Sequence, residues 1–174
     1  MRQNPYGSRV ILNPDGVRMT MTDHDPRQRG LFAAAWSVGY LAATEAEQLD
    51  SLVPAALTGS LGIAEEQPDG SIHRHPVFDV VRDFAQAAGQ PRRTCRADTP
   101  NTIAAVATVR DDGTTVLWLA NLTADAQSVR IVGLEDFSVG MRLDDDASRT
   151  WIDHVAVTDH VILSPYSVVS LQGR

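Results

Sequence analysis

The sequence predicts an α/β segment followed by an all-β segment in a chain of 174 residues. Before Gly89-Gln90-Pro91, β-rich or apolar runs alternate with two apolar patterns of helical spacing, which is the rhythm of βα units in a parallel sheet. After Thr94 the helical spacing disappears, and short β-rich runs recur every 8 to 12 residues or so, which is typical of a small antiparallel β-sandwich. We therefore predict two domains, a βα segment over residues 1–90 and a β-sandwich over residues 91–174.

The first β-rich region spans residues 8–22. Two β-rich runs flank Asn13-Pro14-Asp15-Gly16. Proline at the second turn position and glycine after the turn suit a type I turn with a glycine bulge. This pattern predicts a β-hairpin over residues 8–22.

The first helix is predicted to begin at Asp25-Pro26-Arg27-Gln28. Aspartate can accept from the free N–H groups of the first turn, and proline at the first helical position loses nothing by lacking an N–H. The pattern continues to about Glu45 with two adjacent apolar stripes, which predicts a helix covered on more than one side. The stripes consist of Leu31, Ala35, Val38 and Ala42, and of Phe32, Trp36, Gly39 and Ala43.

A short apolar run at residues 51–59 predicts a buried strand, although Pro54 weakens the pattern. A polar loop with a turn at residues 67–70 follows. The second helix is predicted from His75-Pro76 to Gly89, because the apolar residues between them keep helical spacing and glycine suits the C-terminal cap.

The β-sandwich begins with a predicted hairpin. Residues 103–109 and 114–120 flank Arg110-Asp111-Asp112-Gly113, which is a turn sequence. Further strands are predicted over residues 127–132, 137–143, 151–157 and 161–171, the last interrupted by Pro165. Trp118 lies in the apolar strand 114–120, so we assign it to the core.

Composition excludes several classes of protein. The formal net charge of −7 argues against broad nucleic-acid binding, which needs a basic surface. The chain has no lysine, which excludes a Schiff-base lysine and a Walker-type phosphate loop, and all its basic residues are arginine, as in a GC-rich bacterial source. A single cysteine, Cys95, with no apolar signal core and no apolar run of about 18 residues, leads us to expect a reduced cytoplasmic protein without a membrane anchor.

Residues 25–39, DPRQRGLFAAAWSVG, resemble a late barrel helix of the D-apionate lactonase family. The resemblance continues through Thr58-Gly59, His75-Pro76, residues 117–123 and the closing residues 163–171. It implies a glycoside-hydrolase-like (β/α)₈ barrel with a C-terminal β-domain. This chain would hold the last two βα units and the β-domain, roughly the last third of such a protein.

Two features depart from the family pattern. The family's last barrel strand carries Tyr-Glu before its Thr-Thr-Gly, whereas this chain reads Ala55-Ala56-Leu57-Thr58-Gly59, with no acid. The hairpin predicted over residues 8–22 is the second departure, because a barrel strand would not turn back there. An Asn-Pro in the family, following the preceding barrel strand, resembles Asn13-Pro14.

Barrel enzymes place their chemistry in the loops that follow the strands. The two loops of this kind offer Asn13, Asp23 and His24 in the first, and Glu65 and Glu66 in the second, as candidate substrate-binding residues. Paired carboxylates serve as acid and base when they flank a sugar ring, but adjacent residues in a polar loop seldom converge, so a solvated loop is the competing interpretation.

Other candidates have simpler interpretations. His73 and His75 could hold a metal, but helix entry with solvent exposure explains them as well. Asp144-Asp145-Asp146 lacks the spacing of a calcium loop and is interpreted as a solvated turn, and Asn121-Leu122-Thr123 matches a glycosylation sequon. Trp36 and Trp118 are assigned to core packing, which leaves Trp151 as the tryptophan best suited to stack on a sugar. No metal or cofactor is predicted.

The leading hypothesis is the C-terminal part of a carbohydrate-active barrel hydrolase, for which the resemblance implies hydrolysis of a sugar-acid lactone. The alternatives are a non-catalytic β-sandwich module that binds carbohydrate or a partner protein, and a degenerate remnant without activity. We expect a sugar-acid or carbohydrate ligand, and a homo-oligomer or a companion barrel fragment. The sequence shows no complete catalytic constellation, so the catalytic residues stay unassigned, and the chain alone is expected to be inactive.

Overall fold

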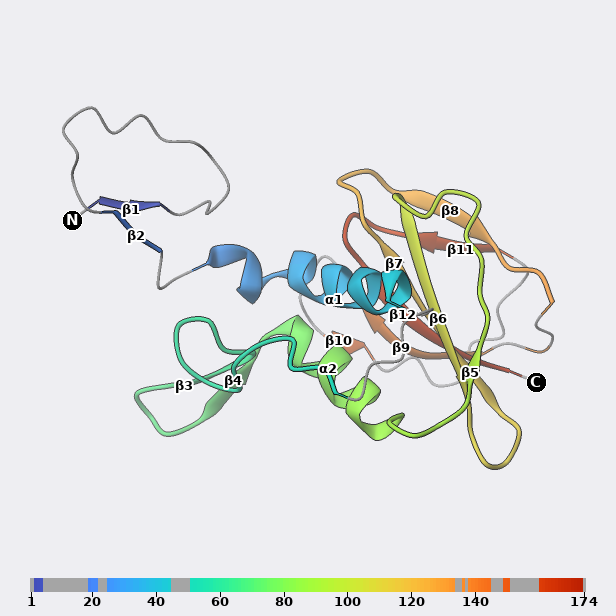
Figure 1. Cartoon of the computed structure of the whole chain (residues 1–174), viewed down its shortest axis with the longest axis horizontal. Helices are drawn as coiled ribbons and strands as arrows, with labels where there is room; N and C mark the ends of the chain where they lie inside the picture. Colours follow the sequence, from blue (N-terminus) through green and yellow to red (C-terminus); the bar gives the residue numbers. More distant parts are fainter. Residues whose placement is uncertain are drawn as a thin grey trace.

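The computed structural model describes residues 2–4, 19–21, 25–44, 51–133, 136, 138–144, 149–150 and 160–173. Two helices, α1 (Leu31–Ala43) and α2 (Pro76–Gln86), lie side by side against one face of a β-domain (Figure 1). Short strands β1 (Arg2–Asn4) and β2 (Met19–Met21) lie on the far side of the helices from this domain (Figure 1).

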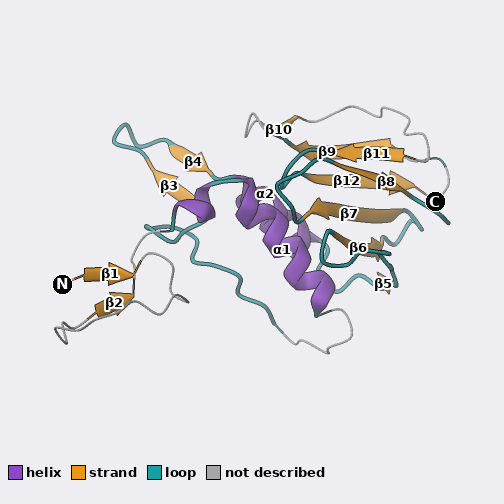
Figure 2. Ribbon diagram, turned by 90° about the horizontal axis from the view of Figure 1, so that it is seen from above, coloured by secondary structure: helices purple, strands orange, loops and turns teal. Residues whose placement is uncertain are grey.

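The β-domain is built on a six-stranded antiparallel sheet, seen edge-on in Figure 2. Its strand order is β10-β9-β12-β7-β6-β5. A two-stranded antiparallel sheet of β8 and β11 completes the predicted sandwich. The strands are β5 (Arg92–Arg93), β6 (Ile103–Val109), β7 (Thr115–Asn121), β8 (Gln127–Arg130), β9 (Ser138–Leu143), β10 (Arg149–Thr150), β11 (His160–Leu163) and β12 (Val168–Gly173).

The main sheet is covered on both faces. One face packs on the helices, with Val38, Val80 and Trp118 in a single apolar cluster. The other face packs beneath β11, with Leu117 and Leu163 in a second cluster. Because side chains alternate between the two faces of a strand, double coverage explains why every residue of β7 is buried.

The predicted start of the first helix is confirmed. Asp25 is the N-cap, and its Oδ1 accepts from the backbone N–H of Arg27 at 3.0 Å. The helix begins as a 3₁₀ turn over Pro26–Arg29, and the extended backbone of Gly30 separates this turn from α1. The sequence pattern treated the two as one helix because a 3₁₀ turn continues the apolar and capping signals of an α-helix.

Replacing Asp25 with alanine is expected to lower the free energy of unfolding by about 0.5–2 kcal/mol, the usual cost of losing a side-chain N-cap. The substitution also removes the exposed ion pair with Arg27, which adds little. Thermal unfolding of Asp25→Ala and Asp25→Asn measures the effect, and asparagine should restore most of the stability because it can also cap. An unchanged midpoint for the alanine variant would contradict the capping role.

The second helix and the turns also follow the prediction. His75 is the N-cap residue of α2, Pro76 opens it, and Gly89 just beyond its end has a φ of 82°. The predicted turns close as expected, with the N–H of Gly70 bonded to the carbonyl of Gln67 and that of Gly113 to the carbonyl of Arg110. The loop between residues 60 and 75 is more ordered than predicted, since β3 (Ala64–Glu66) and β4 (Ile72–Arg74) form an antiparallel hairpin.

The buried strand predicted over residues 51–59 is wrong. This segment makes a single parallel bridge, between Ala56 and Gly62, and Val53 and Leu57 are 84% and 65% exposed. A parallel strand becomes regular and buried only between two neighbouring strands and beneath helices. Among the described residues, no strand lies along either edge of this segment.

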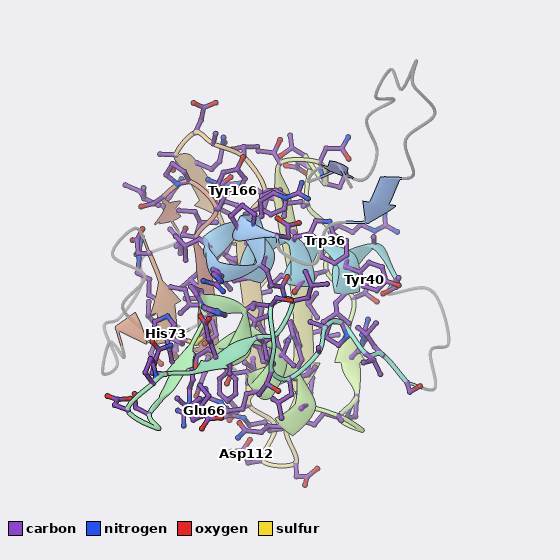
Figure 3. All side chains as sticks on the ribbon, turned by 90° about the vertical axis from the view of Figure 1, so that its left-hand side faces the viewer. Trp36, Tyr40, Glu66, His73, Asp112 and Tyr166 are labelled. Atoms are coloured by element: carbon purple, nitrogen blue, oxygen red, sulfur yellow. The ribbon has the colours of Figure 1, made fainter. Side chains whose placement is uncertain are left out.

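The prediction that Trp36 packs in the core is also wrong. Trp36 is 51% exposed and stacks on Tyr40, which is 39% exposed. The two rings lie next to each other in Figure 3. Helical spacing identifies an apolar face but not the element that covers it. In α1 the sheet covers the face that holds Ala34 and Val38, and the Trp36 face stays open.

The first strands differ from the predicted hairpin. β2 pairs in parallel with β1, in the register of Arg2 with Met19, as successive strands of a barrel do. Residues 5–18, and with them most of the predicted hairpin, lie outside the described residues, as do the strand predicted over 151–157 and Trp151. Across the described ranges, no helix has the length and apolar composition that a membrane crossing requires.

Candidate functional site

The structure describes part of the predicted candidate site. Glu65 and Glu66 lie on β3, in the loop between the 51–59 segment and α2. Asn13, Asp23 and His24 lie outside the described residues, so their candidacy stays a prediction. The chain between β2 and α1 is described from Asp25 onward.

A polar cluster joins these two loops. Arg29, at the end of the 3₁₀ turn that precedes α1, places its Nη2 3.2 Å from Oε1 of Glu65. Glu65 is directly opposite His73 in the β3–β4 register, and the His73 ring meets the His75 ring edge-on at 5.1 Å between centroids. We call Arg29, Glu65, His73 and His75 the loop cluster.

Glu66 does not join the loop cluster. Successive residues of a strand point to opposite faces, and Glu66 is paired with Ile72, which is half exposed. Figure 3 labels Glu66 and His73 on this hairpin. The two adjacent carboxylates therefore do not converge, and the groups nearest to Glu65 are a guanidinium and an imidazole rather than a second acid.

His75 is the most buried member of the loop cluster, with 3% of its surface exposed. Its backbone N–H donates to the carbonyl of Ile63 at 3.0 Å, and its Nδ1 has no hydrogen-bond partner among the described residues. The prediction of helix entry is confirmed for His75, but the prediction of solvent exposure is wrong. The backbone bond to Ile63 and the ring contact with His73 hold His75 against the hairpin, which accounts for its burial at the start of α2.

Burial lowers the pKa of His75, and the electrostatic effects of His73 and Arg29 lower it further, against an opposing effect of Glu65. The imidazole is therefore uncharged at neutral pH. An uncharged imidazole carries one nitrogen that accepts a hydrogen bond and one that donates, so His75 can both accept from and donate to a neighbouring side chain.

The lowered pKa of His75 predicts a loss of stability in weak acid. Below about pH 6.5 the unfolded chain takes up a proton on this histidine more readily than the folded chain, so the free energy of unfolding falls as the pH falls. We expect the urea midpoint to drop between pH 7 and pH 5, and to drop less in His75→Gln. His73→Gln, which leaves the burial of His75 in place, should keep most of the pH dependence because burial is the largest cause of the lowered pKa. An equal pH dependence in His75→Gln and the wild type would contradict the prediction.

The side chains of the loop cluster are not arranged as the ligands of a metal ion. Within the ranges that the structure describes, no group of three or more histidine, cysteine, aspartate or glutamate side chains is placed to hold a metal ion. His73 and His75 meet edge to face, and the guanidinium of Arg29 takes up Glu65.

Sequence reasoning missed the association of Arg29, His73 and His75 with Glu65. The pairing of Glu65 with His73 had an approximate local signal, because counting outward from the turn at residues 67–70 sets Glu65 opposite Ile72, one residue from its actual partner. The contact of Arg29 with Glu65 had none, since 36 residues separate them in the chain.

Comparison of the chain with known proteins identifies the family that it resembles. The family model described as D-apionate lactonase, TIM barrel domain, matches residues 1–89, and the one described as D-apionate lactonase, C-terminal immunoglobulin-like domain, matches residues 100–171. A D-apionate lactonase from Brucella anthropi is 35% identical over 133 residues, which is 75% of this chain. The chain spans about a fifth (21%) of the length of that relative.

Solved structures agree on the fold. The catalytic domain of the GH30 xylanase C from Talaromyces cellulolyticus superposes with a TM-score of 0.59 at 13% identity, over 84% of this chain and 35% of that one. A GH30 endoxylanase from Clostridium papyrosolvens gives 0.57 at 16% identity, over 92% of this chain and 43% of that one. These likenesses confirm a barrel segment followed by a β-domain.

Proposed function

Because this chain belongs to the D-apionate lactonase family, we propose that it is the C-terminal part of a carbohydrate-active hydrolase that opens a sugar-acid lactone. The substrate and the reaction are inferred from the Brucella anthropi relative. This chain spans about a fifth (21%) of the length of that relative. The proposal includes a place in carbohydrate metabolism in a bacterial cytoplasm, in keeping with a single thiol, Cys95, that forms no disulfide.

The observation that carries the proposal is the ion pair between Arg29 and Glu65. In (β/α)₈ barrels, substrates meet the loops that follow the strands. Arg29 belongs to the loop after β2 and Glu65 to the loop after the 51–59 segment, and the pair holds these two loops together. His73 and His75 lie beside this ion pair, and their imidazoles bring proton-transferring groups to the same end of the barrel segment.

Lactone hydrolysis needs an acceptor for the proton of the attacking water and a donor for the oxygen that becomes negative. Within the loop cluster, the uncharged His75 is suited to hold a proton, and Arg29 and His73 are suited to donate to oxygen atoms of a substrate. We place Arg29 and His73 in contact with substrate, with the buried His75 behind His73, without assigning the base or a nucleophile. Glu65 orients Arg29.

A chimera tests the proposal. The corresponding C-terminal part of the Brucella anthropi relative is replaced by this chain, and opening of the lactone of D-apionate is measured. We expect turnover in the chimera, and a loss of about tenfold or more in kcat/KM for Glu65→Gln, because a displaced loop misplaces its donors. Glu66→Gln, on the opposite face of the same strand, is the matched control and should keep full activity. A folded chimera without turnover would overturn the proposal.

Taken alone, the chain is expected to show no lactone turnover above the uncatalysed rate. Catalytic groups of barrels come from the ends of several strands, and this chain supplies the ends of the last few. The same lactone assay on the isolated chain checks the expectation, and turnover at enzyme-like rates by a compact monomer would contradict it.

We propose that further barrel units cover the open face of the helices, either as a companion barrel fragment or through a second copy of the chain. Trp36, Val53 and Leu57 are more than half exposed on this side. Apolar area of this kind favours association. Light scattering of the isolated chain should therefore report a species larger than the monomer, and Trp36→Glu should shift it toward the monomer. A monomer at all accessible concentrations would be evidence against this surface as an interface.

A further inference from the structure

A polar cleft of ≈ 500 Å³ lies between α2 and the main sheet, away from the loop cluster. Its helical wall includes Arg82 and Gln86. Its floor is formed by β7 and β12, where Ser170 is directly opposite Trp118 and Gln172 is directly opposite Val116. Residues two apart on a strand share a face, so these four side chains form one continuous surface.

The floor of the cleft holds an unused hydrogen-bond donor. Trp118 is 3% exposed, and its indole N–H has no acceptor among the described residues. A buried polar group without a partner costs free energy, and most such groups in folded proteins are paired. The hydroxyl of Ser170 and the amide of Gln172 lie on the same surface, so it carries both donors and acceptors.

The charges of the cleft are balanced. Arg82 is paired with Asp79 at 3.2 Å and with Asp83 at 2.6 Å. Arg110, at the far end, donates from Nη1 to Oε1 of Gln172 at 3.2 Å. Both carboxylates lie on Arg82, and the two guanidinium groups with the two carboxylates sum to no net charge, so these four residues give the cleft no excess of positive charge to favour an anion.

We infer that this cleft binds a neutral saccharide unit. Each sugar hydroxyl both donates and accepts, which matches a surface of amide, hydroxyl, guanidinium and indole N–H groups. The small apolar patch of Val116 and Ala87 suits the C–H face of a sugar ring. An apolar ligand would leave these polar groups unpaired, and the volume is within the range of small-molecule sites. The site is separate from the lactone chemistry and does not depend on it.

Nuclear magnetic resonance of the ¹⁵N-labelled chain tests the inference with D-xylose and D-glucose as neutral probes and D-xylonate as the charged one. At least one neutral sugar should shift the indole N–H resonance of Trp118 along a saturating curve, with a dissociation constant of millimolar order. The indole resonance of Trp36, outside the cleft, should not move. No saturable shift of Trp118 with either neutral sugar, or binding of D-xylonate alone, would overturn the inference.

Two variants separate binding from folding. Gln172→Ala should weaken binding of the neutral sugar about fivefold to tenfold, as expected for a lost hydrogen bond, and Trp118→Phe should do the same when affinity is followed by calorimetry. Gln67→Ala, on the turn between β3 and β4, is the matched control and should bind as the wild type does. Wild-type affinity in a folded Gln172→Ala and a folded Trp118→Phe would show that the sugar binds elsewhere.

Discussion

Trp118→Ala is expected to lower the free energy of unfolding by about 3–5 kcal/mol, the range for truncating a fully buried large aromatic side chain. Trp118 is 3% exposed and packs on Phe84 of α2 at 4.8 Å between ring centroids. It belongs to the apolar cluster that also holds Val38 of α1 and Met141, so it packs α2 on the β-domain within a core that α1 shares. Removing it opens a cavity at the junction of the two predicted domains.

Urea unfolding measures the effect, and Trp36→Ala is the matched control. Trp36 is 51% exposed, so its truncation should cost on the order of 1 kcal/mol, mainly through the lost stacking on Tyr40. Similar stability changes for the two variants, or wild-type stability of Trp118→Ala, would mean that Trp118 does not hold the helices on the sheet.

The elements that the sequence predicted well are those with local signals. Asp25 caps its helix through a group two residues away, and Gly70 and Gly113 close turns of a few residues. The strands of the sandwich follow alternation and turn residues, and this part of the fold needs no distant partner to be recognised. The sequence also indicated the family, through residues 25–39 and the motifs that follow them.

The elements that the sequence predicted badly depend on neighbours outside their own segment. Residues 51–59 have the composition of a buried strand, but no described strand flanks them, and Val53 is exposed. Trp36 lies on an apolar helical face, but the sheet covers a different face of α1. Apolar spacing reports that a face can be buried and does not report what covers it.

The residues of the candidate site also fall into those with a local signal in the sequence and those that depend on distant segments. Glu65 was chosen from its loop, but counting outward from the turn at residues 67–70 would have paired it with Ile72, one residue short of His73. The contact of Glu65 with Arg29 and the burial of His75 come from packing between segments more than 10 residues apart. A single sequence has no local pattern that predicts such packing. The expectation that Glu65 and Glu66 do not converge agrees with the structure, since neighbours on a strand point apart.

Asn121→Ala is expected to be nearly as damaging as Trp118→Ala, at about 3 kcal/mol, because it removes a buried side chain that makes several hydrogen bonds. Asn121 ends β7 and is fully buried. Its Nδ2 donates to the carbonyls of Asp125 at 2.7 Å, Ser164 at 3.0 Å and Leu163 at 3.3 Å. Its Oδ1 accepts from the N–H of Thr123 at 2.9 Å and from its hydroxyl at 2.8 Å.

These contacts give the Asn121-Leu122-Thr123 motif a structural role in place of the glycosylation that its spacing suggests, since the side chain has no exposed surface. Asn121→Asp should be at least as destabilising as Asn121→Ala, because a carboxylate would face three carbonyl oxygens where the amide donates. Thr123→Val, which removes only the hydroxyl of the network, should cost about 1 kcal/mol. Urea unfolding of the three variants orders them, and a stability of Asn121→Ala equal to that of Thr123→Val would show that the carbonyls find other donors and that the turn does not depend on Asn121.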